Sequence, residues 1–180
     1  MNKKYELTNE TKEWYGRTLH RIKALKDFND VKAGDLGGWI EKENNLSHDG
    51  NCWIYNNARI YDNAYVYGNA RVYDDACVYD NAYVHGNACV YGNVLVYSAC
   101  INNNADIKSD FDICTFSGFG TKARITTAYR CKDNSIRINC GCFNGTLEEF
   151  RNRIKETCKN KIQREYLLMC DMIEEHFKED

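Results

Sequence analysis

Tyrosine recurs at one position of a short repeat and forms the most distinctive chemical surface of this chain. The residue that follows each branched apolar position is tyrosine in seven of eight repeats, and His85 fills the remaining one. If one coil takes roughly 18 residues, Tyr65, Tyr67, Tyr83 and His85 share one face. Tyrosines are common in protein interfaces because each combines a large apolar ring with a hydroxyl group. We therefore predict a protein-binding surface at these four residues.

Histidine is the side chain with which this protein could do acid–base chemistry. The sequence contains four: His20, His48, His85 and His176. A general base needs a group that orients it and a substrate within hydrogen-bond reach. His85 lies in a regular repeat and His48 in an irregular stretch before the repeats, and the sequence shows no orienting partner for either. We expect no catalytic residue and no cofactor.

Cysteine is abundant, with ten residues in 180. The first residues do not resemble a signal peptide, so free thiols in a reducing cytosol are favoured over disulfides. Cys131, Cys140, Cys142 and Cys158 could supply four thiolates to a zinc ion. However, Cys140 and Cys142 are separated by one residue, unlike the usual Cys-x2-Cys spacing of zinc sites. We expect buried free thiols and no metal site.

The repeat itself must position these side chains. A branched apolar residue falls at every sixth position, and the members are Ile54, Ile60, Val66, Val72, Val78, Val84, Val90 and Val96. Ala64 points to the same side as Val66 because a strand alternates its side chains. Gly68-Asn69 then supplies a turn signal. Four-residue strands joined by two-residue corners predict a three-sided parallel β-helix, and the apolar spacing does not fit an amphipathic α-helix.

The period fails at both ends of the repeat, and this sets the expected domain boundaries. Val96 is followed by Ile101, a spacing of five that shifts the register by one residue. Strand edges at the ends of a solenoid need caps. We expect an N-terminal β cap over residues 1–35, with strands near 4–8 and 17–25. The β-helix should then cover 36–116, and a small α+β module should cover 117–180.

The expected C-terminal module contains two strands and two helices. The strand candidates are residues 124–130 and 135–140. Thr146 is followed three residues later by Glu149, a capping-box pattern that predicts the start of a helix. An apolar stripe predicts a second helix over roughly residues 163–177.

The repeat resembles the hexapeptide-repeat family, whose members form left-handed parallel β-helices. The stretches LKDFNDVKAGDLGGWIEKENNLS and CGCFNGTLEEF resemble parts of repeat proteins from phages and prophages of low-GC bacteria. Such proteins are named acyltransferases or polymer-forming proteins, and these names rest largely on the repeat. The resemblance implies that an enzyme of this type would use a histidine base between subunits, with coenzyme A along the coils.

Charge limits the classes of partner. A net charge of -2 and a pI near 6.1 argue against a surface that binds nucleic acid or membrane, and no apolar run is long enough for a membrane span. We expect a non-enzymatic protein of the host bacterial cytosol that binds a host protein or protein complex. The phage resemblance implies inhibition of a defence system such as a CRISPR effector. An acyltransferase-like enzyme and a self-assembling structural element, a homo-oligomer, stay open as alternatives.

Overall fold

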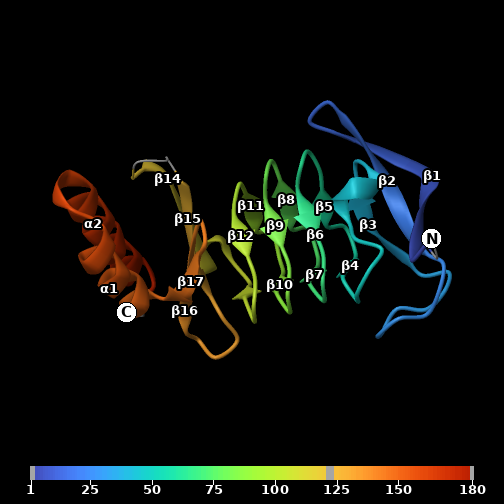
Figure 1. The fold of residues 1–180 in the computed structure, drawn as a ribbon. Helices are drawn as coiled ribbons and strands as arrows, with labels where there is room; N and C mark the ends of the chain where they lie inside the picture. Colours follow the sequence, from blue (N-terminus) through green and yellow to red (C-terminus); the bar gives the residue numbers. More distant parts are fainter. Residues whose placement is uncertain (1–2, 121–123, 179–180) are drawn as a thin grey trace.

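The computed structural model describes residues 3–120 and 124–178, and these residues form a mainly β structure (Figure 1). A parallel β-solenoid of about four turns occupies the middle of the molecule. An antiparallel hairpin lies at its N-terminal end, and an antiparallel sheet with two helices lies at the other end. The predicted solenoid with two end pieces is confirmed.

Three parallel sheets form the faces of the solenoid. The first face contains β3 (Leu36–Ile40), β5 (Arg59–Ile60), β8 (Cys77–Tyr79) and β11 (Leu95–Tyr97). The second contains β4 (Trp53–Ile54), β7 (Arg71–Val72), β10 (Cys89–Val90) and β13 (Asp106–Ile107). The third contains β6 (Tyr65–Val66), β9 (Tyr83–Val84) and β12 (Cys100–Ile101), and Leu46 extends it by a parallel bridge to Val66.

The interior of the solenoid is filled as the repeat predicts. The branched residues from Ile54 to Val96 have no exposed surface, and the alanines two positions earlier are at most 1% exposed. The shift after Val96 is also present, because Val84 pairs with Ile101 and the coil is one residue shorter there. The interior of the solenoid is close-packed by these valine, isoleucine and alanine side chains, and it leaves little room for a larger side chain at the same positions.

The corners explain why the strands contain two or three residues and not the four expected. A residue with positive φ occurs at every sixth position from Asn56 to Ser98. Gly68 is one of them, with φ of 71°, and a Cβ atom there would lie 3.1 Å from the backbone nitrogen of Gly86 in the next coil. Left-handed backbone at each corner ends the strand and turns the chain onto the next face.

The N-terminal cap is a hairpin of β1 (Tyr5–Trp14) and β2 (Arg17–Ala24). Strand β2 pairs antiparallel with β3, so the hairpin extends the first face of the solenoid. The first strand is longer than the predicted 4–8, and it continues to Trp14. The 3-10 helix η1 (Glu43–Asn45) then leads into the first coil.

The C-terminal module begins earlier and is larger than expected. The last parallel strand is β13, and after the 3-10 helix η2 (Asp110–Asp112) the chain enters an antiparallel sheet. This sheet contains β14 (Ile113–Phe119), β15 (Arg124–Arg130), β16 (Ile136–Cys140) and β17 (Phe143–Thr146). The coils therefore stop before residue 116, and two strands flank the two predicted ones. The sequence does not predict β14 and β17, because apolar and polar residues do not alternate regularly in either segment.

The helices α1 (Leu147–Thr157) and α2 (Asn160–His176) close the module. Thr146 is the N-cap of α1: its hydroxyl accepts from the Glu149 backbone N–H, and the Glu149 carboxylate accepts from the Thr146 N–H. The predicted capping box is confirmed. Tyr129 on β15 covers the last coil, where its hydroxyl lies 2.6 Å from Asn102 Oδ1. In the described part of the chain, neither helix has the length and apolar character needed to cross a membrane.

Candidate functional site

The third face of the solenoid brings together the four residues predicted to form a surface, here called the tyrosine patch: Tyr65, Tyr67, Tyr83 and His85. The rings of Tyr67 and His85 stack with centroids 4.7 Å apart and planes 7° apart. Tyr65 stacks on Tyr67 with centroids 4.9 Å apart. Tyr83 is 45% exposed, whereas the other three are half-buried. Their shared face follows from the coil length, because Tyr65 pairs directly with Tyr83.

His85 is placed so that its imidazole is neutral at physiological pH. Burial lowers the pKa of His85, since the charged form loses hydration there. Its Nε2 atom lies 3.7 Å from Cys100 Sγ on β12, and burial raises the pKa of that thiol. Both shifts favour the uncharged forms, an imidazole and a thiol, over a pair of ions. In residues 3–120 and 124–178, no hydrogen bond is made to the Nδ1 atom of His85.

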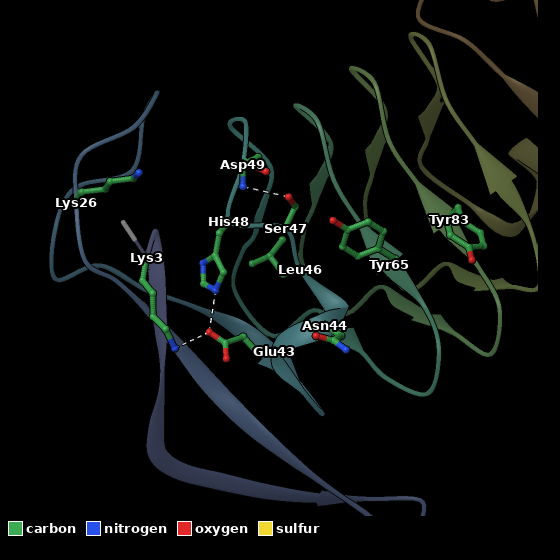
Figure 2. A pocket seen from close by; sticks show the side chains of 10 residues that line it. All are labelled: Lys3, Lys26, Glu43, Asn44, Leu46, Ser47, His48, Asp49, Tyr65 and Tyr83. Atoms are coloured by element: carbon green, nitrogen blue, oxygen red, sulfur yellow. Dashed lines mark hydrogen bonds and ion pairs between the residues drawn. The ribbon is translucent and has the colours of Figure 1, made fainter. Parts of the chain in front are cut away.

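An open hollow of about 870 Å³ lies between the N-terminal cap and the tyrosine patch (Figure 2). Tyr65 and Tyr83 line it from the coils. The other lining residues come from the cap and the first coil: Lys3, Lys26, Glu43, Asn44, Leu46, Ser47, His48 and Asp49. Tyr65 and Tyr83 of the tyrosine patch thus form part of a concave surface that combines apolar and polar side chains, as small-ligand sites commonly do.

His48 and Glu43 form a carboxylate–imidazole pair at the wall of this hollow (Figure 2). His48 Nε2 lies 2.8 Å from Glu43 Oε1, and Lys3 Nζ lies 2.7 Å from the same oxygen. The hydrogen bonds from Lys3 and His48 lower the pKa of Glu43. A carboxylate in this position orients an imidazole, as in enzymes that use histidine as a base.

The second ring nitrogen of His48 is already engaged. The backbone N–H of Lys4 donates to His48 Nδ1 at 3.3 Å, and the ring stacks on Tyr5 with centroids 4.3 Å apart. Because Nδ1 accepts a hydrogen bond, Nε2 carries the proton that Glu43 accepts. Neither nitrogen is available to take a proton from a substrate. His48 therefore attaches the hairpin to the first coil.

The charges that line the hollow nearly balance. Lys3 and Lys26 provide positive charge, and Glu43 and Asp49 provide negative charge. A cluster of unpaired cations, which phosphate groups require, is missing from this lining. The lining therefore lacks the excess of positive charge that would favour the phosphates of coenzyme A.

The other two faces carry stacked tyrosines too. Ring centroids are 4.4–4.9 Å apart in the ladder Tyr55, Tyr73 and Tyr91, and 5.2–5.9 Å apart in the ladder Tyr61, Tyr79 and Tyr97. Stacking along the axis is therefore a general property of the coils. A second hollow, of about 490 Å³, lies between the hairpin and the first face, where Tyr61 and Tyr79 line it. The presence of His85 in the stack distinguishes the third face. The remaining histidines are elsewhere, His20 on β2 and His176 on α2.

The four cysteines considered for zinc do not form one cluster: Cys140, Cys142 and Cys158 line a small cavity of about 160 Å³ in the C-terminal module, and Cys131 lies apart from them. Cys131 packs in the core of the solenoid, Cys140 and Cys158 pack in the core of the C-terminal module, and Cys142 is exposed. Among the residues described, no group of three or more histidine, cysteine or acidic side chains is arranged to hold a metal ion.

The sequence did not reveal Glu43, Lys3 or Cys100 as parts of this region. Glu43 lies five residues before His48, a spacing with no standard meaning outside a helix. Lys3 reaches it across 40 positions of sequence. Cys100 carried a usable signal, because the shortened coil places it beside Tyr83 on the third face.

Comparison with known proteins gives a short match. No protein-family model matches the chain. A stretch of 38 residues, 21% of this chain, is 58% identical to part of a protein of Escherichia coli K12 named "Uncharacterized acetyltransferase YdcK". The matched part is only 12% of that protein's length.

Proposed function

We propose that this chain is an acyltransferase-like hexapeptide-repeat protein in which His85 is the general base. The observation that carries this proposal is the neutral imidazole of His85, with no hydrogen bond to Nδ1 from the described residues, on a face continuous with the hollow. The solenoid fold and the short similarity to a protein named as an acetyltransferase support the same reaction class. Fold alone does not determine function, so the residues of the site must supply the chemistry.

In this proposal His85 transfers a proton between the acceptor substrate and the leaving thiolate. The imidazole takes a proton from the hydroxyl or amine of an acceptor, and the acceptor atom attacks the carbonyl carbon of a thioester. The carbon–sulfur bond breaks, and the departing thiolate receives the proton from the imidazolium. A base that is neutral near pH 7 suits this role, because a protonated histidine could not accept the proton.

The hollow suits the acceptor. Its lining mixes charges of both signs with Ser47, Asn44 and two tyrosines. Such a surface favours a small polar molecule with hydroxyl or amine groups, held by hydrogen bonds and by stacking on Tyr83. The thioester would supply the activated acyl group, and no residue of the hollow is assigned to hold it.

The test is an acylation assay on the purified protein. Acetyl-coenzyme A is supplied with panels of polyhydroxy and polyamine acceptors, and release of free thiol is followed. We expect turnover with at least one acceptor class and a measurable affinity for acetyl-coenzyme A by calorimetry. Absence of both across the panels would contradict the proposal.

A second candidate function is protein binding through the tyrosine patch. The exposed ring of Tyr83 favours it, since an aromatic side chain that is 45% exposed beside other aromatic residues suits an interface. A host protein, including a component of a defence system, or a second copy of this chain would be the partner. Replacing Tyr67 and Tyr83 by serine should then abolish partner capture or change the oligomeric size, and unchanged behaviour would contradict it.

A further inference from the structure

Lys4 and Cys52 meet inside the N-terminal end of the solenoid. Lys4 Nζ lies 3.1 Å from Cys52 Sγ and donates to the Cys52 carbonyl oxygen at 2.9 Å. Each residue is 0% exposed. A lysine is almost never fully buried unless it is paired with a charge. Among residues 3–120 and 124–178, the remaining polar contact of Nζ is the Gly50 carbonyl oxygen at 3.5 Å, so within this part of the chain the thiol is the principal side-chain partner of the amine.

The surroundings favour the uncharged form of both groups. Burial lowers the pKa of the Lys4 ammonium and raises the pKa of the Cys52 thiol. The ring of Phe28 covers the amine from another side, 5.2 Å from Nζ. This contact by itself favours the charged form, whereas burial is the largest influence on the pKa of Lys4 and lowers it. An amine that loses its proton here has a free lone pair, and water is excluded from it. The structure thus holds a potential nucleophile in contact with an oxidisable sulfur.

We propose that Lys4 and Cys52 are a modification site, at which one oxygen atom joins Nζ to Sγ when the protein meets molecular oxygen. One thiol, one primary amine and one O2 molecule give one N–O–S link and one water. The S–H bond and one N–H bond break, and an S–O and an N–O bond form. Sulfur and nitrogen each lose two electrons, and O2 takes all four. One of its oxygen atoms stays in the link, and the other leaves as water with the two hydrogens.

The burial of the pair is compatible with this reaction. Molecular oxygen is small and apolar, so it enters a protein interior that excludes charged reagents. The amine is already in contact with the sulfur, so the linking step needs no rearrangement of the chain. The exposed Cys142 has no such neighbour among the described residues, which makes it the matched control.

The link would control the cap. It joins residues 48 apart, at the start of β1 and at the first coil, and a cross-link over such a loop restricts the unfolded chain. Lys4 also donates its backbone N–H to His48 in the wall of the hollow. Oxidation would therefore fix the N-terminal wall of the hollow, whatever reaction or partner the hollow serves.

Mass spectrometry on the intact protein tests this directly. One sample is purified under air, and the other is purified anaerobically with a thiol reductant. We expect the aerobic protein to be heavier by about 14 Da, one oxygen atom less two hydrogens, and to return to the lower mass with reductant. Peptide mapping should give a linked peptide that contains Lys4 and Cys52, and isotopically heavy O2 should label it.

Substitutions of Lys4, Cys52 and Cys142 test which residues form the link. Lys4→Arg keeps a cation but lacks the amine and should lose the mass shift, and so should Cys52→Ser. Cys142→Ser should keep it. An unchanged mass in the aerobic wild-type protein, a shift that persists in Lys4→Arg, or a link mapped to other residues would each overturn the proposal. The isotope measurement on the wild-type protein decides the matter even if a variant fails to fold.

Discussion

The imidazole of His85 lies parallel to the ring of Tyr67, with centroids 4.7 Å apart and planes 7° apart. The His85 ring is half-buried, and this burial lowers the pKa of His85. Tyr67 is thus one of the groups that cover the His85 ring, together with Cys100.

Replacing Tyr67 by serine should raise the pKa of His85 toward its ordinary value, because water regains access to the ring. Loss of the stacked ring should also lower the free energy of unfolding by about 1–2 kcal/mol. NMR titration of the His85 ring and urea unfolding measure the two effects. Tyr67→Phe keeps the stack and should change neither by much. A pKa that stays unchanged in the serine variant would show that Tyr67 is not the cause.

The stability of the protein should fall on acidification in a way that depends on His85. Its pKa is lower in the folded state, so the unfolded chain binds more protons between the two pKa values. The free energy of unfolding should therefore fall as the pH drops through about 6.5, the ordinary value, toward the folded pKa. In His85→Gln this part of the dependence should disappear. An identical slope in wild type and variant would contradict it.

Gly68 should tolerate alanine poorly. Its φ is 71°, and a Cβ would lie 3.1 Å from the Gly86 nitrogen in the next coil. Left-handed strain and the close approach together should cost about 1–3 kcal/mol. Gly118→Ala is the matched control, since Gly118 has φ of 82° and no atom within 4 Å of the added Cβ. Chemical unfolding should show a larger loss at Gly68, and equal losses would mean that the contact between coils is unimportant.

Arg59 should hold the hairpin against the solenoid. Its guanidinium lies 4.1 Å from the ring centroid of Trp14 and 2.9 Å from Asp75 Oδ1. Arg59→Met should lower the free energy of unfolding by about 2 kcal/mol and change the fluorescence of Trp14. Arg71→Met, at a more exposed arginine 3.8 Å from Asp30, should have a smaller effect. If the two variants lost the same free energy of unfolding, Arg59 would not be more important than Arg71 for holding the hairpin.

The sequence predicts the coils well because their determinants are local. Val66 and Ala64 point inward because side chains alternate along a strand, and Gly68 turns the chain. The residues within each six-residue repeat therefore determine its conformation. The contact of Arg59 with Trp14 joins residues 45 positions apart, and no periodicity encodes it. Periodicity also does not encode the hydrogen bond from the Lys4 backbone N–H to His48 Nδ1. This bond occupies the nitrogen that His48 would need to act as a base.

The candidate site was predicted in part. Tyr65, Tyr67, Tyr83 and His85 were placed on one face by counting coil residues, and the structure has them there. The hollow depends on how the hairpin and η1 pack against the first coil, which is a tertiary property. For this reason the sequence predicts a protein-binding surface at these four residues but not the concave surface that Lys3, Glu43 and His48 form beside Tyr65 and Tyr83.

If His85 acts as a general base, two histidine variants should differ in the thioester assay. His85→Gln should lower the acylation rate by at least about 100-fold, with an unchanged circular dichroism spectrum. His176→Gln, on α2, should keep the wild-type rate. In the wild-type protein the rate should fall as the pH drops and His85 becomes protonated. A wild-type rate in His85→Gln, or no thioester turnover in the wild-type protein, would contradict the account.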